Sequence, residues 1–230
     1  MTTRNEPART ITATAGGPFV CGDELSIRTA DYVWSEKGEP LTWQFGSPRQ
    51  IESGTALCRC GESSDKPFCD GSHAEHEWDA TSSPPAGSYA ERALPKQGTK
   101  LTVTDDPSLC VHAGLCGTER ATVWSLMSET NDTDTRATVI RMVEKCPSGR
   151  LVNIVDGDVV EPALPAGVGV IPDGPLWLTG NVTVRMDDGT ELEVRNRVTL
   201  CRCGASASKP LCDGSHVDVD FEAGGLGSAD

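Results

Sequence analysis

The sequence predicts an α+β fold dominated by β-strands, in which two copies of one module flank a different unit. One observation is a Cys-rich segment of sixteen residues that occurs twice, each time after a strand-rich stretch. A second is the composition of the 230-residue chain, which has only 37% apolar residues together with 24 Gly and 15 Pro. Such a composition predicts short elements and many turns. A chain of this length has room for one large domain or two to three small ones.

The repeat can be followed residue by residue. Residues 58–73 read CRCGESSDKPFCDGSH and residues 201–216 read CRCGASASKPLCDGSH, with twelve of the sixteen positions identical. Upstream, GPFVCGDELSIR (17–28) matches GPLWLTGNVTVR (174–185). The offset between the copies is 157 upstream and 143 in the Cys-rich segment. This difference predicts a 14-residue insertion in the first copy, within ADYVWSEKGEPLTWQFGSPRQIES.

Two stretches rich in Pro and small residues separate the repeats from the middle unit. SSPPAGS (82–88) and PALPAGVGVIPDGP (162–175) are typical of linkers. The GVGV at 167–170 belongs to the second of these and has the wrong spacing for phosphate binding. We therefore expect three domains, a first repeat over 1–85, a middle domain over 86–161 and a second repeat over 162–230.

The middle unit has its own pattern of elements. LTVT (101–104) and LVNIV (151–155) predict strands. DTRATVIRMVEK (134–145) predicts a helix with Ile140 and Val143 inward and an aspartate available to cap it. This arrangement is a small α/β unit inserted between the repeats.

Each repeat ends in the pattern C-x-C-x8-C-x3-H, which supplies three thiols and one imidazole. If a helix starts at the last cysteine, this cysteine and the histidine lie on one helix face, and the Asp that follows the cysteine can cap backbone N–H groups. Three thiolates and an imidazole make a four-ligand metal site, although structural zinc usually uses C-x2-C pairs. Spacing alone leaves zinc and iron–sulfur open. The candidate ligands are Cys58, Cys60, Cys69 and His73 in the first copy, and Cys201, Cys203, Cys212 and His216 in the second.

Both segments resemble the CDGSH (NEET) iron–sulfur family, whose signature is C-x-C-x2-[S/T]-x3-P-x-C-D-G-[S/A/T]-H. The likeness covers all sixteen residues of each copy. It implies one [2Fe–2S] cluster per motif, with the C-x-C pair on one iron and the later cysteine and histidine on the solvent-nearer iron. Family members with one motif form dimers with a shared β-cap. Two copies in one chain therefore imply an intramolecular pseudo-dimer and a monomeric protein.

Three further cysteines in the middle unit form the pattern C-x5-C…C-P, and they are Cys110, Cys116 and Cys146. Bacterial ferredoxins use C-x2-C-x2-C with a distant C-P cysteine. Three thiolates suit a [3Fe–4S] cluster, or a [4Fe–4S] cluster with a non-cysteine ligand for which His112 is the nearest candidate. Residues 98–155 resemble the divergent mono-cluster 4Fe–4S ferredoxin-like domains, which implies that these cysteines bind a cluster.

A structural interpretation of these three cysteines stays open, because free cysteine is often a small buried apolar residue. Cys21 is expected to be such a residue, since the counterpart region of the second copy has no cysteine. Cysteines that cluster in a chain without an export signal more often bind metal or carry redox chemistry than form disulfides.

Composition excludes several classes of function. With 34 acidic and 20 basic residues the net charge is -14, so nucleic acid binding is not expected. The chain has no apolar run of the roughly 18 residues that a membrane helix needs. The N-terminal MTTRNEPARTITATAGG lacks the apolar core of a secretory signal. We therefore expect a cytoplasmic protein that does not contact membranes.

No catalytic motif stands out. The sequence contains no G-x-G-x-x-G, G-x4-G-K-[ST], H-E-x-x-H or G-x-S-x-G pattern. We therefore expect a non-enzymatic electron carrier that exchanges electrons with a redox partner protein, either a reductase or an acceptor. The alternatives are a redox- or iron-responsive regulator or cluster donor, a zinc-stabilised interaction protein, and an enzyme whose clusters feed a substrate site.

Overall fold

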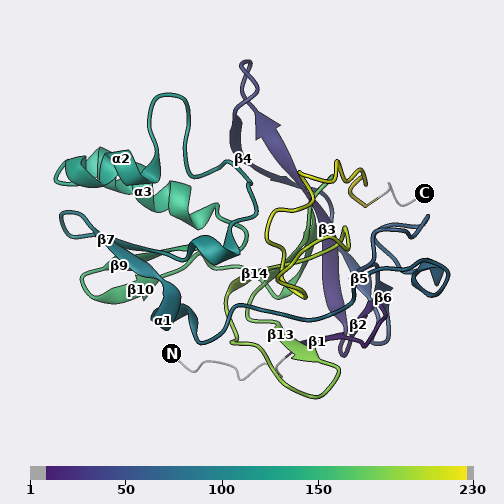
Figure 1. The fold of residues 1–230 in the computed structure, drawn as a ribbon. Coiled ribbons are helices and arrows are strands. Elements are labelled where there is room, and N and C mark those ends of the chain that lie inside the picture. Colours follow the sequence, from purple (N-terminus) through teal and green to yellow (C-terminus); the bar gives the residue numbers. More distant parts are fainter. Residues whose placement is uncertain (1–8, 227–230) are drawn as a thin grey trace.

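The computed structural model describes residues 9–226, and the strands of the two repeats make up its larger part (Figure 1). The first repeat contains β1 (Thr10–Ala13), β2 (Phe19–Cys21), β3 (Leu25–Trp34), β4 (Pro40–Phe45), β5 (Arg49–Ile51), β6 (Ala56–Leu57) and the 3-10 turn η1 (Ser72–Ala74). The second repeat contains β11 (Gly167–Val170), β12 (Leu176–Thr179), β13 (Thr183–Met186) and β14 (Arg197–Leu200). These strands form one sheet in the order β13-β1-β2-β6 and another in the order β14-β12-β11-β3-β4, with β5 beside β3.

The two repeats exchange strands. β1 pairs in parallel with β13, with Thr10 opposite Thr183, and β11 pairs in parallel with β3, with Gly167 opposite Ser26. An offset of 157 residues converts each of these pairings into the other, because it carries Thr10 to Gly167 and Ser26 to Thr183. The first strand of each repeat therefore lies in a sheet with the third strand of the other.

One hydrophobic core is shared by both repeats. Ile11 and Phe19 from the first repeat are buried in the same cluster as Leu178 and Leu200 from the second. Burial of apolar surface is the main favourable term in folding, so each repeat contributes to the stability of the other.

The segment GVGV was expected to belong to a linker, and that prediction is wrong. It forms β11, a strand between β3 and β12 in the six-stranded sheet. Val168 and Val170 are buried. A Cβ atom on Gly169 would lie 3.3 Å from the Cβ of Ala30 and 3.4 Å from that of Trp177. Gly169 allows close packing against the neighbouring strands. Only the composition of the segment resembles that of a linker.

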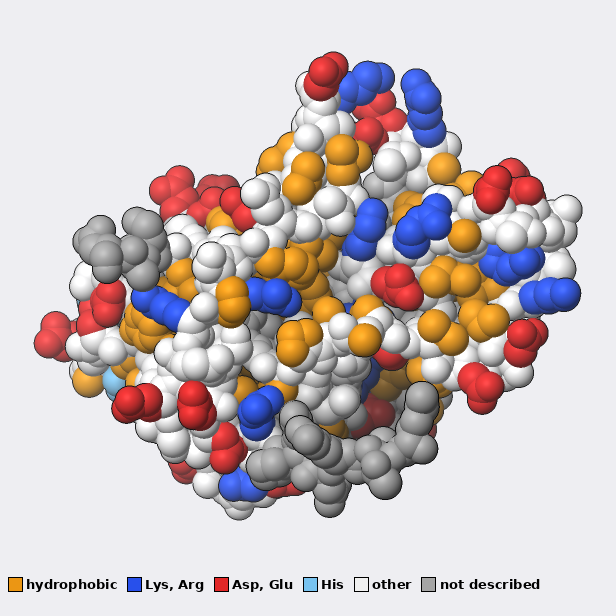
Figure 2. All heavy atoms as spheres, turned by 180° about the vertical axis from the view of Figure 1, so that it is seen from behind, with side chains coloured by type: hydrophobic (Ala, Val, Ile, Leu, Met, Phe, Trp, Pro, Cys, Tyr) orange, Lys and Arg blue, Asp and Glu red, His pale blue; other side chains and the backbone are white. Residues whose placement is uncertain are grey.

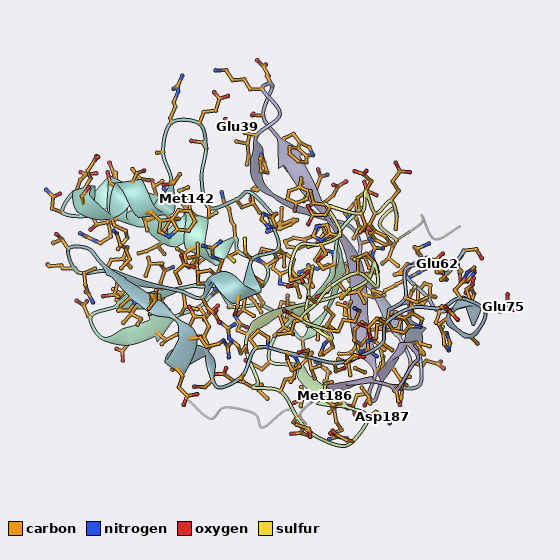
Figure 3. The ribbon with its side chains drawn as sticks, in the orientation of Figure 1. Glu39, Glu62, Glu75, Met142, Met186 and Asp187 are labelled. Carbon is orange, nitrogen blue, oxygen red and sulfur yellow. The ribbon has the colours of Figure 1, made fainter. Side chains whose placement is uncertain are left out.

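The predicted insertion in the first repeat forms a hairpin from the outer half of β3 and from β4, which projects from the molecule in Figure 1. It contacts the middle domain through β4 and the residue just before it. The indole Nε1 of Trp43 donates to the carbonyl of Lys145 at 2.8 Å, and the Lys145 amine donates to the carbonyl of Leu41 at 2.7 Å. Glu39, labelled in Figure 3, accepts the backbone N–H of Glu119 at 2.6 Å.

The middle domain packs its helices on a four-stranded sheet with the order β10-β9-β8-β7 (Figure 1). Its elements are α1 (Tyr89–Arg92), β7 (Leu94–Gln97), β8 (Thr102–Asp105), η2 (Pro107–Leu109), α2 (Val123–Leu126), η3 (Met127–Glu129), α3 (Thr133–Glu144), β9 (Leu151–Val155) and β10 (Asp158–Val160). The predicted helix and both predicted strands are confirmed. Val143 is buried as expected, whereas Ile140 is half-buried and Val139 is the second fully buried position.

Charged side chains of both signs lie on one face of the molecule. Figure 2 shows acidic and basic side chains interspersed over one face, so the net charge of -14 is not concentrated in a single patch there. No helix within residues 9–226 is long and apolar enough to span a bilayer.

Candidate metal centres

Each CDGSH-like motif divides its four predicted ligands into two pairs. The two Sγ atoms of each C-x-C segment lie 3.8 Å apart. The Sγ atom of the later cysteine faces the histidine Nδ1 atom at 3.3 Å in the first motif and 3.4 Å in the second. The pairs are Cys58 with Cys60 and Cys69 with His73 in the first motif, and Cys201 with Cys203 and Cys212 with His216 in the second.

These distances fit pairs of donors that share a metal atom. Two thiolates on one tetrahedral metal with metal–sulfur bonds of about 2.3 Å have their sulfurs about 3.8 Å apart. In the described part of the chain, no three His, Cys, Asp or Glu side chains converge in the way needed to hold one metal ion. The expected single four-ligand site is therefore divided in two. This geometry fits a group with two metal atoms, each held by one pair.

The turn between the later cysteine and the histidine is shorter than predicted. Instead of a helix, the first motif has only the 3-10 turn η1. The predicted role of the aspartate is confirmed. Asp70 accepts the backbone N–H groups of Ser72 at 3.0 Å and Ser64 at 2.8 Å, and Asp213 accepts that of Ser215 at 3.0 Å. Hydrogen bonds from the Ser72 hydroxyl and from these N–H groups hold the pKa of Asp70 well below its usual range.

The arginine inside each C-x-C segment is a functional candidate that sequence reasoning missed. Arg59 and Arg202 are each only 1% exposed. The Arg202 guanidinium donates to the carbonyls of Ile171 at 2.7 Å and Gly174 at 2.9 Å, and Arg59 donates to that of Thr14 at 2.9 Å. These bonds tie each C-x-C segment to the connection between the first two strands of its own repeat, which are β1 and β2 or β11 and β12.

Each arginine also faces an aromatic ring that the repeat supplies. The Arg59 guanidinium carbon lies 5.3 Å from the ring centre of Trp78, and that of Arg202 lies 5.2 Å from the ring centre of Phe221. Both aromatics occur five residues after the motif histidine. The recurrence of the arginine and of the aromatic in both copies was the signal that could have identified this unit.

The arginines place positive charge between the two motifs. Burial lowers the pKa of Arg202 to about 10, and the Cys58 thiolate of the other motif opposes this shift. Burial also lowers the pKa of Arg59, and the Cys201 thiolate of the other motif opposes that shift. Each buried cation therefore lies within electrostatic range of the first cysteine of the opposite motif.

The two C-x-C segments meet through glycine. Gly61 and Gly204 have φ angles of +90° and +79°. A Cβ atom on Gly61 would overlap the carbonyl oxygen of Cys203, and one on Gly204 would overlap that of Cys60. Glycine is required at both positions because the backbones approach closely there.

The three cysteines of the middle domain are brought together near a half-buried cation, Arg150. Cys116 lies within electrostatic range of both Cys146 and Cys110, and burial raises the pKa of its thiol. The Arg150 guanidinium lies beside Cys110 and is fixed by Asp105, with 2.6 Å between Nε and Oδ1. A cubane-type cluster places each thiolate on a different iron, so these residues fit such a group without forming one coordination sphere.

Comparison with known families matches all three regions. The model described as "Iron-binding zinc finger CDGSH type" matches residues 16–74 and 173–217. The model described as "Divergent 4Fe-4S mono-cluster" matches residues 96–156 between them. The chain is a tandem CDGSH-type protein with a central 4Fe–4S-type domain. All eleven predicted ligand residues of this tandem CDGSH-type protein lie inside the matched regions, which belong to families that bind iron–sulfur clusters. No curated protein and no solved structure matches it.

Proposed function

We propose that this tandem CDGSH-type protein is a one-electron carrier with two [2Fe–2S] clusters and a third cluster of three or four irons. The observation that carries the proposal is the division of each CDGSH ligand set into two pairs with the spacing of donors on one metal. A structural zinc site would instead gather four ligands around one ion.

In this proposal the C-x-C pair of each motif holds one iron, and the later cysteine and the histidine hold the other. When bound, a [2Fe–2S] cluster accepts and releases one electron. The histidine would bind its iron through Nδ1. A neutral imidazole in place of a thiolate makes the site less negative and raises its reduction potential. Arg59 and Arg202 add positive charge beside the opposite motif, which also favours the reduced state.

The central domain is proposed to hold its cluster through Cys110, Cys116 and Cys146, with Arg150 as the nearby counter-charge. The family match favours a 4Fe–4S-type group. With three cysteine ligands, the cluster either has three irons or takes a fourth ligand that is not cysteine.

The exchange of strands supports an intramolecular pseudo-dimer, in which the two repeats form the shared cap that single-motif proteins make from two chains. The protein is then a monomer with internal two-fold pairing and a ferredoxin-like insert. Its electron partner is a separate protein, either a reductase or an acceptor, and the chain turns over no substrate of its own.

Reversible reduction tests the carrier role. The anaerobically purified protein is reduced with dithionite and reoxidised, and its visible absorbance and iron content are followed. A carrier bleaches and recovers its spectrum with unchanged iron. Loss of iron on each cycle, or transfer of clusters to an apo-ferredoxin, would instead favour the cluster-donor role.

A further inference from the structure

The two CDGSH motifs differ in what covers the glycine of the CDGSH sequence. Gly71 and Gly214 have the same backbone conformation, with φ angles of +97° and +95°. A Cβ atom on Gly71 would meet no atom within 4 Å. A Cβ atom on Gly214 would overlap Cδ2 of His112, and would lie 3.0 Å from its Nε2 and 3.4 Å from the carbonyl oxygen of Cys110. The middle domain is therefore seated on the second motif at this glycine.

Ligand residues of the two sites are neighbours across this contact. Cys212 of the second motif is within electrostatic range of Cys110, and His216 is within range of His112. His112 and His216 also line one cavity of about 620 Å³. The second motif thus presents its histidine-bearing side to the segment that begins at Cys110.

A buried arginine makes a second link between the same two sites. Arg197 lies in β14, the strand that leads into Cys201, and is 1% exposed. Its Nη1 atom donates to the carbonyls of Val143 and Cys146, both at 2.8 Å, and its Nε atom lies 2.7 Å from Oε2 of Glu161. The backbone of the last central cysteine is therefore fixed to the second repeat.

The first motif lies away from the middle domain. Glu62 within this motif and Glu75 just after it lie at one edge of the molecule in Figure 3, whereas Met142 of α3 lies on the opposite side. The first motif approaches the second through the backbones at Gly61 and Gly204. The second motif thus lies between the first motif and the middle domain.

We infer that the three sites are connected in one order, from the first CDGSH site through the second to the central site. The junction between the last two is the packing of residues 110–112 on Gly214. This order rests on the proposed function in one respect, because clusters must occupy the sites for electrons to follow it.

A matched pair of glycine variants tests the junction. Gly214→Ala and Gly71→Ala introduce the same strain at positive φ, but only the first displaces His112. We expect backbone hydrogen exchange over residues 110–116 to be faster in Gly214→Ala and unchanged in Gly71→Ala. The double variant Gly214→Ala/His112→Ala restores space and should return exchange toward that of His112→Ala alone. Equal exchange in both glycine variants would overturn the junction, and this measurement does not depend on which metal is bound.

Electron paramagnetic resonance of the dithionite-reduced full chain tests the order. The variants His73→Cys and His216→Cys assign the two [2Fe–2S] signals, because each changes the ligands of one site. We expect the second-site signal to relax faster than the first-site signal, since a paramagnetic central cluster is its neighbour. Gly214→Ala should slow this relaxation and Gly71→Ala should not.

The outcomes separate the inference from the proposed function. Faster relaxation of the first-site signal, or equal effects of the two glycine variants, would overturn the order while the protein remains a reversible carrier. Absence of labile sulfide from the wild-type protein would overturn the carrier role and the order of electron flow. In that case the hydrogen-exchange measurement would still test the contact between residues 110–112 and Gly214.

Discussion

Arg197 and Cys146 are joined across the interface of two domains, with 2.8 Å between the guanidinium Nη1 atom and the cysteine carbonyl oxygen. The same guanidinium also donates to the carbonyls of Val143 and Glu144 at the C-terminal end of α3. A helix C-terminus favours positive charge because its last carbonyls lack partners inside the helix. Arg197 therefore stabilises the end of α3 and positions the cysteine that follows it.

Removal of Arg197 should be costly. Arg197→Met leaves several carbonyls and the Glu161 carboxylate without their buried partner, and we expect the free energy of unfolding to fall by about 3–5 kcal/mol. Arg197→Lys keeps the charge but not the planar set of donors, so its effect should be intermediate. Urea unfolding measures both variants.

Arg185→Met is the matched control, because Arg185 pairs with Glu191 at 2.8 Å on the exposed surface of the same repeat. An exposed pair contributes at most about 1 kcal/mol. If both methionine variants lost the same small free energy, the interface role of Arg197 would be contradicted.

Replacing the motif histidines should lower the reduction potentials. In His73→Cys and His216→Cys a thiolate takes the place of a neutral imidazole, so the oxidised cluster is favoured. We expect a decrease on the order of 100 mV at the altered site, measured by redox titration of the visible spectrum. His76→Ala is the control for the first motif, since His76 is exposed and outside the pairs. A potential that does not respond to the ligand change would exclude histidine ligation.

Cys21 predicts a specific pH dependence of stability. Burial raises the pKa of its thiol from an ordinary value of 9.0 to about 11. The stability that comes from burying the neutral thiol is complete below about pH 9 and is lost as pH rises toward 11. We expect wild type to lose about 1 kcal/mol more than Cys21→Val between about pH 7.5 and pH 10. Parallel losses, or a loss of iron in Cys21→Val, would contradict the structural role.

Replacing one central cysteine should remove the whole central cluster and leave the clusters of the two CDGSH sites in place. Cys146→Ser should remove about three or four irons per chain and leave about four. Iron and sulfide analysis together with the spectrum of the remaining clusters measures this selectivity. Unchanged iron in the variant would return Cys110, Cys116 and Cys146 to structural thiols.

Much of the metal chemistry could be predicted from the sequence, because the ligand spacing is repeated and local. Cys58, Cys60, Cys69 and His73 form two close pairs within sixteen residues. The helix α3 could also be predicted, because a single amphipathic segment determines it.

Long-range relationships could not be predicted. β1 and β13 are separated by about 170 residues of chain, and nothing in Thr10–Ala13 indicates its partner. The strand at 167–170 resembles a linker because it contains two glycines, of which Gly169 packs against Ala30 and Trp177 and Gly167 against Ser26. The sequence CDGSH is identical in the two motifs. Nothing within the repeat therefore indicates that His112 contacts Gly214 and not Gly71.

Iron, acid-labile sulfide and zinc per chain of the anaerobically purified protein test the central claim most directly. Two [2Fe–2S] clusters and one cluster of three or four irons predict about 7 or 8 iron with a similar amount of sulfide and no stoichiometric zinc. About 2 or 3 zinc per chain without sulfide would contradict the electron-transfer proposal and leave a metal-stabilised interaction protein.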